Sequence, residues 1–478
     1  MNLLLILILL FLLTNQDEQI KFVFQIHRHG ARAPIFNLTK QENKYIDIYK
    51  EEWFLPEELT ETGKRMHYLV GAHNRKKYIE DNEFLSKNYN PYEILVKSTD
   101  VNRTLMSIYA QLQGLYPQNT FEEIDKNVYY RNPNLIYPQN FLNDNQLLKQ
   151  INEKYKQYFE RNSPLPNKIT IIPVHNFNYK SHEIQLYSPD YCPGIKNSYE
   201  EGKKSEIMKN LVENLSEDLV NKLKIIANLS DINFMEDYYT LFGFMDTYVA
   251  DIYDDRELKV LEDNNVNIDE LNKTAYDFLL KDYEFVNYFN NITSIYSMSP
   301  ILREILFYMN DIIINDGDNE HKVKYLIFSG HDTNIAGFEI FNNKMFDTPV
   351  EYANFAQTEY YELFINGSEK LENEDNYYVR YLRGDNVKFE IDYKSFKEKI
   401  MENLWTDKQI YKFCNFDVVK IKSKNLKIAT IILSIIDSIL IIFLIILIKI
   451  IIKKKNYNKI ENDIDKLHPL NSFKKNDN

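Results

Sequence analysis

The chain has 478 residues but only two cysteines, nine histidines and fewer basic than acidic side chains. Two cysteines allow at most one internal disulfide, and so few histidines without a carboxylate-rich partner motif do not favour a metal-dependent enzyme. The formal net charge of −13 argues against broad nucleic-acid binding, although it still permits a local group of arginines. The sequence also lacks internal repeats and long linkers, apart from a lysine-rich stretch near residue 420.

The most informative stretch is RHGARAP, from Arg28 to Pro34, which follows a short apolar segment typical of a strand. Guanidinium groups match phosphate oxygens and stay charged at any working pH, so Arg28 and Arg32 could hold a phosphoryl group against His29. Nearby positive charge disfavours a protonated imidazole, which would leave His29 nucleophilic in acid. Gly30 would let the backbone approach a ligand closely. Alone, this pattern more often marks an exposed basic turn.

Two later segments place polar residues at the ends of expected strands. YEILVKSTDVNRTLMS changes from an apolar run to a turn and then to a helical pattern, so Arg103 lies near the end of a strand. KYLIFSGHDTN repeats this plan, with a buried strand followed by His331 and Asp332. A third strand is expected over Lys168–His175. Because ligands bind at the carboxyl ends of strands in α/β sheets, these residues are candidate site residues.

Several of these residues also have ordinary structural interpretations. An aspartate between a strand and a helix is often an N-cap, so the pattern alone gives Asp332 either a structural or a catalytic role. Thr99 and Asp100 are assigned to turn and capping roles. His27 and His29 could form a metal-ligand pair, but alternate strand residues face opposite sides of a sheet. His27 is therefore expected in the core.

Four segments in this order, RHGARAP, LTETGKRMHYLVGAHNRKKY, STDVNRTLMS and FSGHDTNIAG, resemble motifs of the histidine acid phosphatases, especially the prostatic and lysosomal branch. The resemblance extends from about Lys21 to about Cys414. It implies an α/β fold of the phosphoglycerate mutase type, with a mainly parallel central sheet, flanking helices and a smaller helical cap. It also implies acid hydrolysis of small phosphate monoesters with no metal or other cofactor.

The resemblance assigns roles to residues of this sequence. His29 is expected to attack phosphorus and form a phosphohistidine, while Asp332 protonates the leaving oxygen and later acts as a base. Both cysteines lie where the family has cysteines, so a disulfide between Cys192 and Cys414 is expected, although the family's other cysteine pairs are missing. The residues expected to bind the phosphate are Arg28, Arg32, Arg103 and His331.

The two ends of the chain predict where this chemistry takes place. Residues 1–18 contain an apolar run typical of a signal peptide, although the charged n-region is missing. Residues 428–452 are apolar and long enough to span a bilayer, and lysines follow. A type I single-pass membrane protein is expected, with a lumenal domain over residues 19–424 and a cytoplasmic tail over residues 453–478. Its destination would be a lysosome, an endosome or the cell surface.

Further signals concern partners and modification. Tyr457 precedes Ile460 with the spacing of endosomal adaptor signals, although such a pair also arises by chance. The possibility of a homodimer stays open. Because Asn102 neighbours Arg103, Asn102 is expected to carry no glycan if this loop lines the pocket. N-glycosylation sequons, consistent with a secreted surface, begin at Asn37, Asn102, Asn214, Asn228, Asn272, Asn291 and Asn366.

Two further patterns concern the fold and the choice of substrate. Helical periodicity over about residues 200–303 predicts the inserted cap, and alternation over residues 360–365 and 377–382 predicts a terminal antiparallel hairpin. The cap is acidic, which disfavours highly anionic substrates. Two alternatives remain: a phytase-like or other specialised phosphomonoesterase of the same family, or a catalytically idle membrane receptor for phosphorylated ligands.

Overall fold

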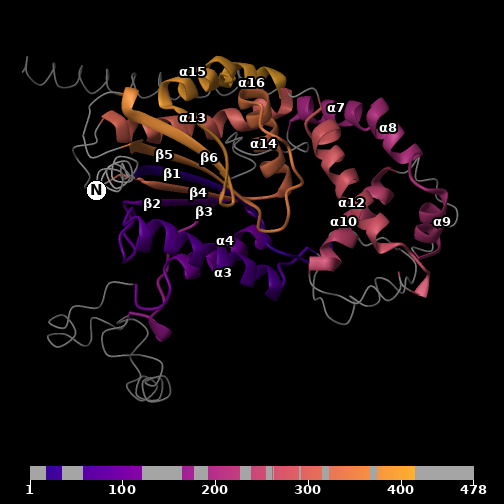
Figure 1. Cartoon of the computed structure of the whole chain (residues 1–478), viewed down its shortest axis with the longest axis horizontal. Helices are drawn as coiled ribbons and strands as arrows, with labels where there is room; N and C mark the ends of the chain where they lie inside the picture. The colour runs from indigo at the N-terminus through magenta and orange to yellow at the C-terminus, as the bar shows by residue number, and fades with distance from the viewer. Residues whose placement is uncertain are drawn as a thin grey trace, which may run out of the picture. The chain divides into compact units, whose positions relative to one another are not determined.

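A computed structural model of the chain describes the residues that are drawn in colour in Figure 1. The predicted signal peptide lies almost wholly outside them, as do the membrane span over residues 428–452, the tail with Tyr457, and the sequons at Asn37, Asn228 and Asn291. Among the described residues, no helix is long and apolar enough to cross a membrane. The described residues are 18–34, 57–120, 164–176, 192–226, 238–253, 261, 263–289, 292–314, 322–366 and 374–414.

The strands of the described part form one seven-stranded sheet with the order β3-β2-β4-β1-β5-β6-β7. Strands β3, β2, β4 and β1 pair in parallel, whereas β1, β5, β6 and β7 pair in antiparallel fashion. The sheet is therefore mixed, and the expectation of a mainly parallel sheet is only partly right. The strands are β1 Glu18–Arg28, β2 Ile94–Ser98, β3 His175–Asn176, β4 Tyr325–Gly330, β5 Thr358–Asn366, β6 Tyr377–Arg383 and β7 Asn386–Asp392.

A short connection explains the antiparallel pairing of β6 with β7. Only Gly384 and Asp385 separate β6 from β7, and Gly384 has a φ of 57°, which suits a two-residue hairpin. Two strands joined so closely cannot run parallel, because a parallel pair needs a crossover. The predicted hairpin over residues 360–365 and 377–382 is confirmed as the antiparallel pair of β5 and β6.

The third predicted strand, Lys168–His175, is mostly wrong. Only His175 and Asn176 pair with β2, as the short strand β3. Pro173 lacks the N–H that a strand would donate, and Asn167 and Lys168 have φ values of 55° and 54°. Ile169 itself is extended, yet residues 169–174 form no strand in the described part of the chain.

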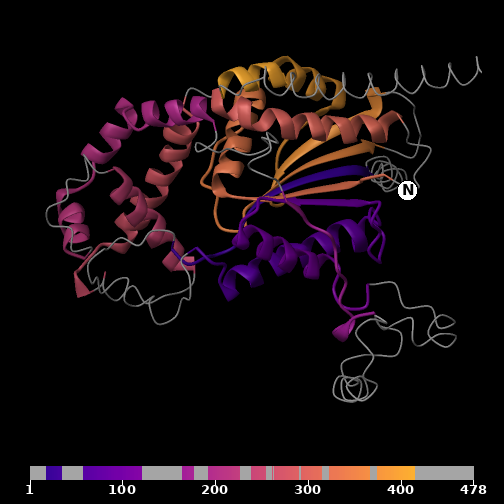
Figure 2. The ribbon, with the colours of Figure 1, turned by 180° about the vertical axis from the view of Figure 1, so that it is seen from behind.

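Alternate residues of β1 pack against helices on opposite faces of the sheet. Phe22, Phe24 and Ile26 pack in a cluster with α13, α14 and α15, whereas Val23 packs in a cluster with Ile108 of α4. Figure 1 and Figure 2 show α3 and α4 on one face of the sheet and α13 and α15 on the other. These helices are α3 Glu61–Arg75, α4 Asn102–Leu115, α13 Ile292–Ile314, α14 Asp332–Phe346, α15 Tyr393–Asn403 and α16 Asp407–Phe413.

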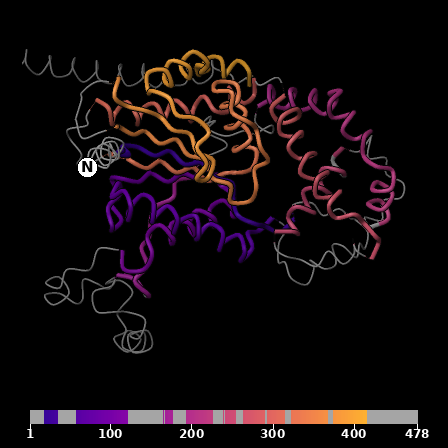
Figure 3. The backbone as a smooth tube through the Cα atoms, in the orientation of Figure 1, coloured from indigo at the N-terminus to yellow at the C-terminus, as the bar shows by residue number. Residues whose placement is uncertain are grey.

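A second group of helices precedes α13 in the chain and has its own buried apolar cluster, which includes Leu223, Met245 and Phe278. The tube in Figure 3 shows this group to one side of the sheet. The predicted cap over about residues 200–303 covers most of it, but α13 packs against the sheet. The cap boundaries stay a prediction. The elements are α7 Pro193–Gly202, α8 Glu206–Glu213, α9 Glu217–Ile226, α10 Tyr238–Tyr253, α12 Ile268–Asp282 and the π-helix η6 Tyr283–Asn287.

One disulfide joins Cys192 and Cys414, which confirms the expected pair. Cys192 is the N-cap of α7, and Cys414 follows the last described helix, so the bond ties the start of the helical group to the end of α16. The residues lie 222 positions apart. A loop of this length stabilises the fold by about 5 kcal/mol in the chain-entropy estimate. The remaining short helices are the π-helix η1 Lys76–Asp81 and the 3-10 helices η5 Pro166–Lys168 and η7 Glu374–Asn376.

Candidate active site

The carboxyl ends of three neighbouring parallel strands lie side by side and bring the predicted residues together. In the register of the sheet, Arg28 of β1 is paired with Gly330 of β4, and Ser98 of β2 is paired with Ser329 of β4. His29 therefore emerges beside His331, and their ring centroids are 5.5 Å apart. The predicted site residues His29, Asp332, Arg28, Arg32, Arg103 and His331 are linked by contacts within one cluster.

The histidine after β1 presents one free ring nitrogen. The Nδ1 atom of His29 lies 2.9 Å from the carbonyl oxygen of Gly30. A carbonyl oxygen only accepts, so Nδ1 carries the ring proton and Nε2 keeps its lone pair. Burial, followed by the charges of Arg103, Arg28 and Arg32, holds the pKa of His29 well below its usual value. A neutral imidazole with a free Nε2 is the nucleophilic form.

Gly30 allows a close approach, but to a helix. A Cβ atom at this position would lie 2.3 Å from the carbonyl oxygen of Gly63 in α3. The backbone N–H group of Gly30 donates to the hydroxyl of Ser107 in α4 at 3.0 Å. The second sequence motif, which contains Gly63, thus supports the loop that carries His29.

Arg28 is fully buried and is held from several sides. Its Nη1 atom donates to the carbonyl oxygen of Ala353 at 2.6 Å, and its Nη2 atom lies 2.8 Å from Oδ2 of Asp332. The guanidinium also stacks over the ring of Phe355 at 4.0 Å from the centroid. Ala353 and Phe355 belong to the segment between α14 and β5, which sequence analysis did not connect with the site.

Arg32 pairs with a residue of the helical group. Its Nη2 atom lies 2.8 Å and 3.1 Å from the two carboxylate oxygens of Asp246 in α10. Both side chains are buried, with exposed fractions of 1% and 7%. Sequence analysis missed Asp246, but there was a signal: it is one of two acidic residues in a largely apolar helix, and a buried charge needs a partner.

Arg103 and His331 contact each other and two further residues. Nη1 of Arg103 donates to Oε2 of Glu57 at 2.8 Å, and its Nη2 atom lies 3.5 Å from Nδ1 of His331. A guanidinium only donates, so Nδ1 accepts and Nε2 donates to the hydroxyl of Thr99 at 3.1 Å. Thr99 therefore lies in the site and does more than the predicted turn role. Asp100 accepts a hydrogen bond from Asn176.

Asp332 is the first residue of α14, and the N-cap is His331. Its Oδ1 atom accepts from the N–H of Thr333 at 2.8 Å. Burial alone would raise the pKa of Asp332, but Arg28 and Arg32 outweigh it and lower the pKa to about 2. The carboxylate is therefore ionised in the free protein at any moderately acidic pH.

The three arginines share one unusual property. Each has a buried Nε–H group that finds no hydrogen-bond acceptor among the described residues. Buried donors are nearly always paired, so three unpaired guanidinium N–H groups in one cluster indicate a site for an external acceptor. Fixed, charged donors around a nucleophilic imidazole suit the oxygens of a phosphoryl group. The three are Arg28, Arg32 and Arg103.

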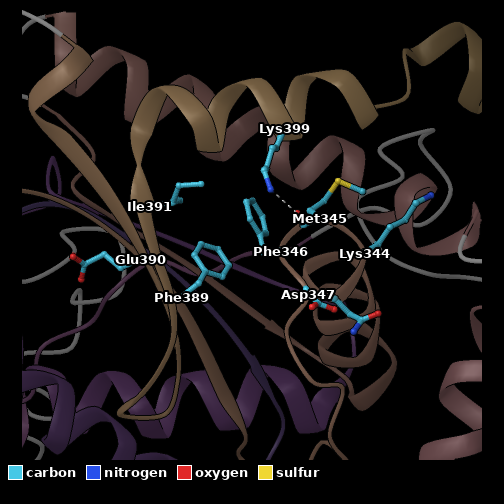
Figure 4. A pocket seen from close by; sticks show the side chains of 9 residues that line it. Lys344, Met345, Phe346, Asp347, Phe389, Glu390, Ile391 and Lys399 are labelled. Carbon is cyan, nitrogen blue, oxygen red and sulfur yellow. Dashed lines mark hydrogen bonds between the residues drawn. The ribbon is translucent and has the colours of Figure 1, made fainter.

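Two other features lie apart from this chemistry. His27 is fully buried, as expected, with its ring 4.5 Å from that of His67. An open cavity of about 360 Å³ contains none of the predicted site residues. Figure 4 shows its lining, which includes Phe346, Phe389 and Lys399.

Comparisons with known proteins agree with these motifs. Residues 19–383 match the model of the histidine phosphatase superfamily, branch 2. The lysosomal acid phosphatase of Xenopus laevis is 39% identical over 105 residues, which are 21% of this chain and 22% of that protein. The prostatic acid phosphatase of Rattus norvegicus is 26% identical over 236 residues, which are 45% and 56% of the two chains. The chain thus matches about a quarter to half of the length of these relatives.

Solved structures support the fold. The apo form of Hafnia alvei phytase superposes with a TM-score of 0.51 at 12% identity, covering 81% of this chain and 97% of the phytase. Citrobacter braakii phytase gives a TM-score of 0.50 at 14% identity, with 81% and 98% covered. At such low identity the likeness concerns the fold alone. Since the family model covers most of the chain, this protein belongs to the histidine phosphatase superfamily, branch 2.

Proposed function

We propose that this chain is an acid phosphatase that hydrolyses phosphate monoesters through a phosphohistidine on His29, without a metal ion. The observation that carries the proposal is the lone pair on Nε2 of His29 beside three arginines whose buried Nε–H groups find no acceptor among the described residues. Such a site binds a phosphoryl group and offers it a nucleophile. The acid phosphatase names of the matched relatives support the same activity.

The first step transfers the phosphoryl group to the histidine. Nε2 of His29 attacks phosphorus while the bond to the leaving oxygen breaks, and Asp332 gives that oxygen a proton. The three arginines stabilise the charge on the equatorial oxygens, which supplies most of the catalysis in phosphoryl transfer. His331 would join them by turning its Nε2–H group from Thr99 to a phosphate oxygen. In the second step, water attacks phosphorus, Asp332 takes a proton from that water, and the P–Nε2 bond breaks to return the lone pair to His29 and release phosphate.

Asp332 must be protonated when the ester bond breaks, although its carboxylate is ionised in the free protein. A bound phosphate competes for the guanidinium of Arg28, which lies 2.8 Å from this carboxylate, and brings negative charge of its own. Both effects raise the pKa of Asp332. Substrate binding thus prepares the proton donor.

The proposal extends to location and partners. Residues 1–18 would be a signal peptide, residues 19–424 a lumenal catalytic domain with the cap inserted over about residues 200–303, and residues 428–452 a membrane anchor. The apolar runs in the sequence and the lysosomal names of several relatives support this arrangement. The tail over residues 453–478 would reach an adaptor through Tyr457. The proposal also includes a homodimer and an Asn102 that carries no glycan.

The test is hydrolysis of 4-nitrophenyl phosphate by the purified full chain, with a chelator present. We expect activity that is highest below neutral pH and an acid-labile phosphoenzyme that His29→Ala abolishes. The control is His73→Ala, because His73 is half-exposed, its ring contacts the exposed Asp385, and its loss should leave turnover intact. Phosphoenzyme in His29→Ala, or reversible loss of activity in chelator, would refute the mechanism. Anion binding without turnover would favour the receptor alternative.

A further inference from the structure

Each arginine of the site has its own carboxylate partner, and the three carboxylates come from three separate parts of the fold. One lies at the start of α14, one in α10 and one just before α3. Each pair has a shortest nitrogen to oxygen distance of 2.8 Å. The pairs are Arg28 with Asp332, Arg32 with Asp246, and Arg103 with Glu57.

The remaining titratable groups of the pocket add no charge. Burial and then the arginines hold the pKa of His29 well below its usual value, and burial, Arg103 and the other arginines lower that of His331 to about 3. Three cations and three anions therefore sum to zero. A dianionic ester would leave this site with two uncompensated negative charges, which costs free energy because the three arginines and two of the carboxylates are largely shielded from water.

The groups around Asp332 make this carboxylate the one that added negative charge affects most. The cations that act on it are Arg28, Arg32 and Arg103. The other titratable groups that face it are His331, the buried Asp282 of α12, Tyr283 and Tyr288 at η6, and Tyr352 before β5. Asp282 and the tyrosines offer no further positive charge. Since no further cation among the described residues acts on Asp332, added negative charge favours a proton on this carboxylate.

We propose that the ester binds as its monoanion and itself delivers the proton that Asp332 later gives to the leaving oxygen. This inference rests on the proposed function. A phosphate monoester has a second pKa of about 6, so the monoanion is the main form in acid. On binding, the phosphoryl O–H bond breaks, the proton moves to Asp332, and the resulting dianion takes the guanidinium of Arg28. The total charge of the complex stays at −1 throughout.

The proton then completes the reaction without an external acid. As the P–Nε2 bond to His29 forms and the ester P–O bond breaks, the proton passes from Asp332 to the departing alcohol. In this scheme Glu57 and Asp246 determine specificity, because they cancel the charge that would otherwise admit a dianion. Glu57 suits a test, because its side chain is 47% exposed and glutamine can take its place without burying a new polar group.

The experiment measures kcat/KM against pH for the full chain with two esters whose second pKa values differ, a nitrophenyl phosphate and an alkyl phosphate. This ratio reports the ionisation of free enzyme and free substrate. We expect the pH at which kcat/KM falls on the alkaline side, the alkaline limb of the profile, to differ between the two esters by the difference of their second pKa values. A limb at the same pH for both esters would overturn the inference alone. Absence of hydrolysis at every pH would overturn the proposed function with it.

A variant tests the charge balance separately. Glu57→Gln leaves one arginine uncompensated, so a dianion becomes acceptable, and the alkaline limb should extend to higher pH. Glu58→Gln is the matched control, because Glu58 lies next in the chain and its carboxylate bonds to Asn102. We expect the Glu58 variant to keep the original limb. If the two variants shift the limb equally, or neither does, pairing with Arg103 does not control the charge of the substrate.

Discussion

The two sides of the site originate in different ways. One side is formed by the ends of β1, β2 and β4, where His29, Thr99 and His331 follow their strands directly and Asp332 comes next. The other side comes from the helical group and the segment before β5, which supply Asp246 and Phe355. The strand side carries the groups that would react, whereas the helical side contacts and orients Arg28 and Arg32. Substrate chemistry and substrate positioning are thus encoded in separate parts of the chain.

The largest effect should come from breaking the helical side. Asp246→Ala leaves the buried Arg32 without its carboxylate, and removing one partner of a buried pair costs about 3–5 kcal/mol. We expect a lower melting temperature and weaker inhibition by phosphate, because Arg32 loses its fixed orientation. Thermal unfolding and inhibition constants measure both changes.

Asp246→Asn, which keeps the shape and one acceptor, should recover much of the stability. Asp218→Ala is the matched control, since Asp218 is an exposed acidic residue that pairs with Lys222 on α9. Such exposed ion pairs contribute little to the free energy of unfolding. Equal effects of Asp246→Ala and Asp218→Ala would remove the distinction between the two sides.

The next effect concerns the strand side and is kinetic. Asp332→Asn keeps the size of the side chain but cannot donate a carboxylic proton. General acid catalysis contributes about 10²-fold or more, and mainly for poor leaving groups. We therefore expect alkyl phosphates to slow by about 10²-fold, and nitrophenyl phosphate to slow far less. An equal loss on both substrates with a lower melting temperature would give Asp332 a structural role at the start of α14.

The strand side could be predicted because its signals are local. An apolar run, a turn and a polar residue stand next to one another in the chain, so β1 and β4 and the residues after them were recognisable. Asp246 lies 214 positions from Arg32, and no local pattern connects them. The apolar run over residues 169–174 misled for the opposite reason: its hydrophobic pattern suits a strand, but Pro173 and the positive φ values before it do not.

The mixed sheet shows the same limit. Buried residues fill both the parallel strand β4 and the antiparallel strand β5, so burial does not distinguish strand direction. Direction follows from the connections, and the connection before β5 contains the residues that hold Arg28. Sequence motifs predicted which residues meet. The supporting contacts around them depend on the tertiary fold.

The smallest expected effect concerns Thr99, which would orient the ring of His331 on the strand side without taking part in the reaction. Thr99 is buried, and its hydroxyl is bonded to Nε2 of His331, whose other nitrogen faces Arg103. Thr99→Val keeps the volume but removes this partner, and one lost hydrogen bond costs about 1 kcal/mol, or about fivefold in affinity. We expect KM and the inhibition constant for phosphate to rise by that factor while kcat changes little. In Thr99→Ser, which keeps the hydroxyl, both constants should stay close to those of the unchanged chain. If Thr99→Val binds phosphate as well as the unchanged chain does, Thr99 serves packing alone.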